Sequence, residues 1–181
     1  METFINAARK VGADVQVLPG LDELVSYVVE RTDGSLLLSP CSSLGRLGVA
    51  ARLKSAGLDV IEEDFRLHGA TAAAGLTGSN FGIAATGTVV LESTQEMVRI
   101  ATTLPEKHFV LLDPRKILAT ADEAVPLLEK FHQQMPQAYL AYISGPSRTA
   151  DIERVLTIGV HGPAELHILL IEGLSADLME R

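Results

Sequence analysis

The sequence predicts an α/β domain in which helices flank a mainly parallel central sheet. Two observations support this: short apolar runs alternate with stretches of helical spacing, and hydrophobic residues make up 47% of the chain while aromatic residues make up only 4%. Apolar surface supplied by Ala, Val, Leu and Ile is typical of buried parallel strands covered by helices. The length fits one domain, so we expect residues 1–181 to fold as a single unit.

The first part of the chain contains repeated strand-then-helix units. Pro19-Gly20 separates the first strand from its helix, Ser42 or Ser43 can cap the second helix, and Gly57 ends it. This alternation predicts parallel strands joined by helical crossovers. The predicted elements here are strands at residues 14–18, 35–39 and 58–61 and helices beginning at Leu21 and at residues 42–43.

The middle of the chain changes character. Two apolar runs, 81–84 and 88–91, are separated by only three residues, too few for a helical crossover, so they predict a hairpin or a sharply bent strand. After them, Thr120 to Glu123 fits a capping box for a helix that reaches Phe131. Further strands are predicted at residues 107–112, 139–143 and 165–171.

Composition excludes several classes of function. The apolar runs are far shorter than a spanning helix requires, and the first residues do not form a signal peptide, so we expect a cytoplasmic protein. A single cysteine, Cys41, rules out an internal disulfide and a four-cysteine cluster, so any iron-sulfur cluster must belong to a partner. The net charge of −8 argues against nucleic acid, and the spacing of the five histidines does not indicate a metal site.

Three loops rich in Gly, Ser and Thr are the candidate ligand-binding segments. Such loops let backbone amides approach an anion, and ligands of open α/β sheets bind beyond the carboxyl ends of the strands. The alternative is that these residues only form turns, which is the better interpretation of any one loop alone. The candidate ligand-binding residues are Thr86, Gly87, Thr88, Ser144, Gly145, Ser147, Arg148, Thr149, His161 and Gly162.

Arg148 is the charged member of these loops. Its guanidinium can hold a carboxylate or phosphate through two hydrogen bonds, with hydroxyl donors from Ser147 and Thr149. An ion pair with Asp151 or Glu153 is an equal alternative. Those two acids also fit the first turn of a helix that continues to Leu156, where they would favour the dipole.

For Arg148 we expect a position in one pocket with Thr86, Gly87 and His161. If that charge pair is desolvated, Arg148→Ala should weaken ligand binding by roughly 2–5 kcal/mol with little effect on folding.

Two side chains are candidates for acid-base catalysis. His161 lies between two glycines, where an imidazole can act near neutral pH, and Glu92 ends the second apolar run of the hairpin. An exposed strand-end glutamate is the more frequent explanation of Glu92, and no nucleophile lies beside His161. Cys41 precedes a predicted helix that could lower the pKa of its thiol, although a buried, unreactive cysteine is more common.

The loops carry a resemblance to a known family. The tracts 143–153 and 159–167 resemble the C-terminal signature of the LutC (LUD-domain) family of lactate-utilisation proteins. Residues 75–78 and 84–91, with Leu104-Pro105 and His108, resemble its central motifs, so the similarity covers about residues 68 to 172. One departure is Ala85, where many relatives have an acidic residue, so a proton-transfer role there would be absent.

The resemblance implies a fold of the NagB/RpiA/CoA-transferase type. It also implies a part in oxidising L-lactate to pyruvate beside an iron-sulfur oxidase pair. Our leading hypothesis is an accessory subunit of such a system, in which Arg148 and the Gly-rich loops hold a small carboxylate or phosphorylated ligand. Two other functions stay open: a free-standing isomerase, transferase or cyclo-ligase of the same superfamily, and a structural partner protein without a pocket.

Overall fold

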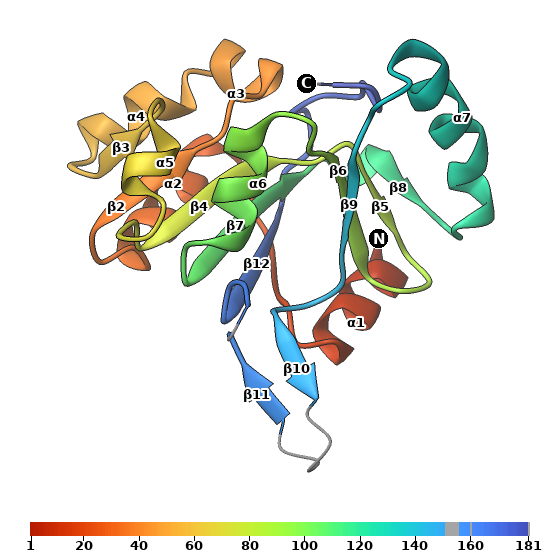
Figure 1. Cartoon of the computed structure of the whole chain (residues 1–181), viewed down its shortest axis with the longest axis horizontal. Coiled ribbons are helices and arrows are strands. Elements are labelled where there is room, and N and C mark those ends of the chain that lie inside the picture. The colour runs from red at the N-terminus through yellow and green to blue at the C-terminus, as the bar shows by residue number, and fades with distance from the viewer. Residues whose placement is uncertain (151–155, 160, 181) are drawn as a thin grey trace.

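Six parallel strands form the central sheet of the computed structural model, which describes residues 1–150, 156–159 and 161–180 (Figure 1). The strand order is β1-β12-β7-β4-β2-β3, and each neighbouring pair is parallel. The predicted mainly parallel sheet is therefore confirmed. The strands are β1 (Asp14–Val17), β2 (Ser35–Leu38), β3 (Asp59–Ile61), β4 (Ala74–Gly78), β7 (Lys107–Leu112) and β12 (Glu165–Leu170).

Helices cover both faces of this sheet. Leu36 and Leu38 of β2 pack in a core cluster with α2 and α4, whereas Leu37 packs with Phe65 and Ala101 of α5 and α6. This division follows from strand geometry, because successive side chains point to opposite faces. The helices are α1 (Glu2–Lys10), α2 (Leu21–Glu30), α3 (Ser42–Arg46), α4 (Val49–Ser55), α5 (Phe65–His68), α6 (Glu96–Thr103) and α7 (Val125–Gln134).

A second sheet lies beside the first and has the order β8-β5-β6-β9 (Figure 1). β5 and β6 pair antiparallel, so the predicted hairpin is confirmed. Phe131 of α7 packs with Phe81 and Val90 of this sheet, while Phe4 of α1 packs in a core cluster with Val89. The strands are β5 (Phe81–Ile83), β6 (Thr88–Glu92), β8 (Ile117–Leu118) and β9 (Leu140–Ile143).

Three local predictions need correction. The helix predicted after Ser42 is two helices, because Gly48 adopts φ +64° between α3 and α4. No side chain caps α7, which follows the 3₁₀ turns η1 (Pro114–Lys116) and η2 (Asp122–Ala124); Glu123 instead accepts a hydrogen bond from the Ala119 amide. Leu156 begins β11 (Leu156–Ile158), which pairs antiparallel with β10 (Arg148–Ala150). Asp151 and Glu153 lie outside the described residues.

The parallel sheet gives the molecule two distinct ends. At the amino end, α1 lies beside the β10-β11 ribbon (Figure 1). There the Ala164 amide donates a hydrogen bond to the Glu106 carbonyl, just before β12 and β7 begin. At the opposite, carboxyl end of the sheet, residues 171–180 follow β12 (Figure 1). Across the described ranges, every helix is too short or too polar to span a bilayer.

Candidate functional site

The three candidate loops are neighbours in the structure. The hydroxyl of Thr88 bonds Thr86 at 2.6 Å and Ser144 at 2.7 Å, which joins the first loop to the second. The Ser147 amide donates to Pro163 at 2.8 Å, which joins the second loop to the third. They lie at the amino end of the parallel sheet, however, because the first two follow strands of the antiparallel sheet and the third leads into β12. The expected position beyond the carboxyl ends is therefore wrong.

The loops line two cavities rather than one pocket. A cavity of about 260 Å³ is lined by Ser144, Gly145, Ser147, His161 and Gly162, and one of about 730 Å³ by α1 with Ala85, Thr86 and Ser144. His161 is exposed at the first cavity and Thr86 lines the second.

Arg148 lines neither of these cavities, so among the described residues these two cavities do not bring Arg148, Thr86, Gly87 and His161 into the one pocket that we predicted. The exposed guanidinium of Arg148 donates to the carbonyl of Val11 at the end of α1. The structure thus gives Arg148 a partner that sequence reasoning did not consider, a backbone carbonyl 137 residues away. The side chain of Thr149 is outside the described part.

Two of the loop glycines serve close packing against α1 and the turn after it. A Cβ on Gly87 would lie 2.1 Å from the Ala8 amide nitrogen, and one on Gly145 would lie 2.1 Å from the Val11 carbonyl oxygen. Both residues also have positive φ, +64° and +80°. The turn-forming interpretation of these two glycines is sufficient, because backbone lies where a side chain would have to fit.

The two catalytic candidates lie at opposite ends of the molecule. His161 is near the entry to β12, whereas Glu92 is buried at the far end of β6 and accepts a hydrogen bond from the Thr94 amide at 2.6 Å. Glu92 lines a small cavity, about 30 Å³, with Cys41 and Glu180. Glu92 and His161 therefore do not form one acid-base pair in this structure.

Buried polar side chains gather at the carboxyl end of the parallel sheet. They come from the end of β6 in the second sheet and from the segments that follow β2, β4, β6, β7 and β12. Open α/β sheets place their ligands beyond the carboxyl ends of their parallel strands. The buried polar side chains are Ser39, Ser43, Ser79, Asn80, Glu92, Ser93, Asp113, Lys116 and Glu180. This gathering, which we call the carboxyl-end site, is the candidate functional site.

Lys116 is the buried cation of the carboxyl-end site. It ends η1, and its side chain is 4% exposed. Its ammonium donates to the Ser79 carbonyl at 2.7 Å and lies 3.5 Å from Oε2 of Glu180. An ammonium this deeply buried needs a counter-charge, so the site as built requires an anion beside Lys116.

Glu180 supplies that anion. Its Oε1 accepts from the Ser43 amide and lies 3.6 Å from the thiol of Cys41. Burial alone would raise the pKa of this carboxyl, but the hydrogen bonds from Ser43 and Ser175 and the charge of Lys116 lower it below the usual 4.5. The site therefore holds a carboxylate in its ionised form.

Neighbouring polar groups fix the backbone that carries Glu180. The Asn80 side-chain amide donates to the carbonyls of Leu178 at 3.1 Å and Glu180 at 2.8 Å. The buried carboxylate of Asp113 accepts from the amides of Gly173 and Ser175, and Arg115 holds it at 2.7 Å. Segment 172–180 is thus hydrogen-bonded along its length.

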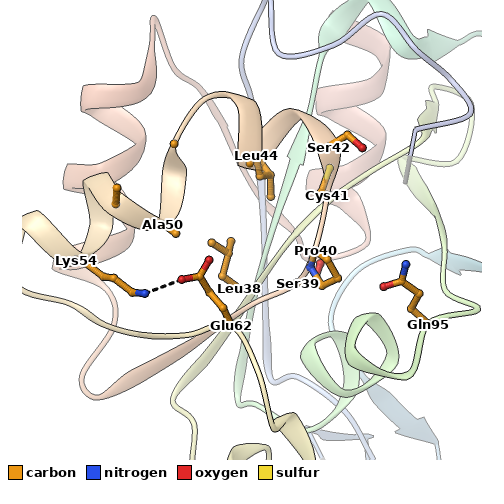
Figure 2. Close-up of a pocket in the computed structure, with 13 residues that line it drawn as sticks. Leu38, Ser39, Pro40, Cys41, Ser42, Leu44, Ala50, Lys54, Glu62 and Gln95 are labelled. Carbon is orange, nitrogen blue, oxygen red and sulfur yellow. Dashed lines mark hydrogen bonds and ion pairs between the residues drawn. The ribbon is translucent and has the colours of Figure 1, made fainter.

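A larger cavity of about 750 Å³ adjoins the site and is lined by the end of β2, α3 and α4 (Figure 2). Lys54 and Glu62 form an ion pair at 2.6 Å on one side of it, and Gln95 lies on the other (Figure 2). Cys41 lines both this cavity and the small one that contains Glu180. Burial raises the pKa of its thiol, which agrees with the buried, unreactive cysteine that the sequence favoured and not with a lowering by the helix.

Sequence reasoning singled out Glu92 of the carboxyl-end site but missed the ion pair of Lys116 with Glu180. The position of Lys116 could have indicated this site, because it lies shortly after the strand predicted at residues 107–112. Asp113-Pro114 forms the turn that ends this strand. Glu180 gives no such signal, because a polar segment after the last strand has no periodicity. No cluster of three or more potential metal-ligating His, Cys, Asp or Glu side chains occurs among the described residues.

The fold and the site together define a class: a parallel α/β domain with buried charged groups at the carboxyl edge of its sheet, the arrangement typical of small-ligand binding. The chain belongs to the LUD domain family, whose sequence model matches residues 1–171. The family resemblance expected from the loop tracts is confirmed.

Individual relatives agree with this assignment. The chain is 33% identical over 154 residues to the uncharacterized protein YkgG of Escherichia coli, which covers 79% of this chain and 65% of that protein. It is 37% identical to a Lactate utilization protein C of Bacillus pumilus, over 61% of this chain and 47% of the relative. The chain is 31% identical to the Lactate utilization protein C of Bacillus subtilis, over 54% of this chain and 41% of the relative. The chain thus spans between 41% and 65% of these relatives.

A solved structure shares the fold. A crystal structure of a DUF162 family protein from Deinococcus radiodurans superposes with a TM-score of 0.67 at 19% identity, covering 94% of both chains. At that identity the likeness concerns the architecture alone.

Proposed function

We propose that this chain is an anion-binding accessory subunit of an L-lactate utilisation system and that it takes its ligand at the carboxyl-end site. The system is proposed from the relatives named Lactate utilization protein C, which this chain matches over part of their length. The redox centres would belong to partner proteins, since the sequence has one cysteine and an iron-sulfur cluster needs several.

The observation that carries the binding proposal is the buried Lys116 ammonium with a carboxylate beside it. A buried cation at the carboxyl edge of a parallel sheet offers charge where ligands of such sheets bind. The Ser43 amide and the Cys41 thiol add uncharged donors, and the cavity in Figure 2 leaves room next to them. The amino-end loops offer less, because the guanidinium of Arg148 is directed to Val11.

Thermal shift measurements on the full chain test this proposal. L-Lactate, pyruvate and inorganic phosphate are titrated separately at constant ionic strength, and we expect at least one to raise Tm in a saturable manner. A ligand at one hundred times its Kd stabilises the folded state by about 2.7 kcal/mol.

Lys116→Met removes the buried cation and should abolish the shift. The matched control is Lys107→Met, which removes a partly buried lysine from the amino end of β7. Lys116→Arg keeps the charge and serves as the folded comparison if Lys116→Met does not fold. No saturable shift with any of the three anions, or an unchanged shift in a folded Lys116 variant lacking the charge, would contradict the proposal.

A further inference from the structure

We infer that the anion accepted at the carboxyl-end site is a carboxylate and that it takes the place of the Glu180 side chain, which occupies the site in the free chain. This inference rests on the proposed function, because it names the ligand class and the competitor of the same site. The carboxylate of Glu180, which is covalently attached to the chain, thus occupies the position that we infer for the ligand carboxylate.

The donors around Glu180 match the two oxygens of a carboxylate. Oε1 is held by the Ser43 amide and lies 3.6 Å from the Cys41 thiol, while Oε2 lies 3.5 Å from the Lys116 ammonium. Each oxygen therefore has its own partners, as in a two-point recognition of a planar group. A tetrahedral phosphate would add at least one further oxygen that needs donors of its own.

The charge around the site also favours a single negative charge. Among the described residues that contact the Glu180 carboxylate, Lys116 alone is positively charged. Glu92 lines the same small cavity and is 8% exposed. A phosphate monoester carries about −1.5 to −2 charges at neutral pH, so its second charge would be buried near Glu92 without a counter-ion.

The backbone that carries Glu180 is held independently of its side chain, whose Oε1 accepts from the Ser43 amide. Its carboxylate stands 3.5 Å from the Lys116 ammonium, longer than the roughly 2.7–2.9 Å of a strong charge-assisted hydrogen bond. Asn80 and Asp113 hold the backbone of segment 172–180 through bonds that do not involve the Glu180 carboxylate. Rotation of one side chain is thus enough to vacate the site.

The adjoining cavity gives the ligand a place for the rest of its body. The cavity in Figure 2 and the small cavity with Glu180 share Ser39, Pro40 and Cys41 as walls. A ligand carboxylate in the position of Glu180 would therefore carry its carbon skeleton past Cys41 toward Leu38 and Leu44, where apolar side chains line the space.

A tethered competitor lowers the apparent affinity for a free one. A group on a short tether has an effective concentration of about millimolar, and the apparent Kd equals the intrinsic Kd divided by the fraction of molecules in which the site is open. Replacing Glu180 with Gln removes the charge that competes for Lys116, so free carboxylates should bind about tenfold more tightly.

Isothermal titration of the full chain with pyruvate and with inorganic phosphate tests the inference. We expect pyruvate to bind Glu180→Gln about tenfold more tightly than the wild type, and more tightly than phosphate binds the same variant. The matched control is Glu172→Gln, an exposed glutamate of the same segment, which should leave both affinities unchanged. Adding Lys116→Met to Glu180→Gln should abolish pyruvate binding.

A second measurement uses the wild type and does not depend on a variant folding. Carboxyl NMR of Glu180 should show its lowered pKa return to the ordinary value of 4.5 when pyruvate saturates the chain, because the displaced side chain loses Ser43 and Lys116.

The outcomes separate the two proposals. Equal pyruvate affinity in the wild type and Glu180→Gln, or tighter binding of phosphate than of pyruvate, overturns the inference and leaves an anion-binding subunit. If neither anion binds the wild type or Glu180→Gln, the proposed function itself is overturned, and the inference with it.

Discussion

The two ends of the central sheet use different physical means to hold their loops. At the amino end, Gly87 and Gly145 have no side chain, so the loop backbone packs closely against α1 and the turn after it. The guanidinium of Arg148 donates to the carbonyl of Val11. At the carboxyl end, buried charges hold the segments that follow the strands. The glycines of the amino-end loops therefore indicate close backbone packing. The buried charged groups expected of a ligand site lie instead at the carboxyl end of the sheet.

This contrast changes how a loop rich in Gly and Ser should be interpreted. Such a loop binds anions only if its amides are free, and the Ser147 amide is already bonded to Pro163. A buried ammonium such as Lys116 cannot be left without an anion, so it is the stronger indication of a site.

The largest effect that would test the contrast is expected for Gly87→Ala at the amino end. The new Cβ would meet backbone of α1 at 2.1 Å, so overpacking adds to the strain of a positive φ, and the free energy of unfolding should fall by about 3 kcal/mol or more. Gly48→Ala is the matched control, because Gly48 has the same φ of +64° with open space around it. It should cost about 1–2 kcal/mol. Equal losses in urea denaturation would show that packing against α1 is not the reason for Gly87.

A smaller effect concerns pH. His108, the second residue of β7, is buried and bonds Thr77 at 2.9 Å. Burial, with a smaller contribution from His167, lowers its pKa from 6.5 to about 3. The unfolded chain therefore binds one more proton between these values, and stability should fall by about 1.4 kcal/mol per pH unit as pH drops below 6.5.

The pH range in which His108 lowers stability lies above the range in which the carboxyl-end carboxylates do. The lowered pKa values of Asp113 and Glu180 contribute stability that is lost only as pH falls below about 4. His108→Gln should remove the decline between pH 6.5 and 4.5, and the exposed His132→Gln should retain it. Denaturation midpoints across this range decide the matter; a decline that persists in His108→Gln would assign it to other groups.

The smallest effect is expected for Arg148→Ala. Loss of one exposed hydrogen bond to Val11 should reduce stability by about 1 kcal/mol, and pyruvate binding at the opposite end of the sheet should not change. Arg52→Ala, which breaks an exposed pair with Asp22, is a suitable comparison for titration and melting. A large loss of anion binding with normal melting would instead restore Arg148 as the anion clamp.

Much of the fold could be predicted because its strands are apolar and short. The strand over residues 107–112 was predicted at its observed bounds, and the hairpin at 81–91 followed from a three-residue gap. β4 was missed because Ala-Gly-Leu-Thr-Gly contains two glycines, which disfavour strands in isolation. Gly75 is nevertheless suited to its place, because a Cβ there would lie 2.0 Å from the Ala101 carbonyl of α6.

The candidate site was harder to predict because its parts are far apart in the chain. Lys116, Ser43 and Glu180 meet only after β2, β7 and β12 lie in one sheet. The sequence places Arg148 and His161 in prominent loops, but it does not indicate that β12 enters the sheet from the end where those loops lie.

The pairing of β1 bears on how the chain is made. β1 forms its ladder with β12 alone, about 150 residues later, so the first strand leaves the ribosome long before its partner exists. Contacts this distant slow folding, and an unpaired strand edge invites association with other chains in the meantime. Because β12 lies between β1 and β7 and leads to segment 171–180, the sheet and the ion pair of Glu180 with Lys116 both depend on the position of β12.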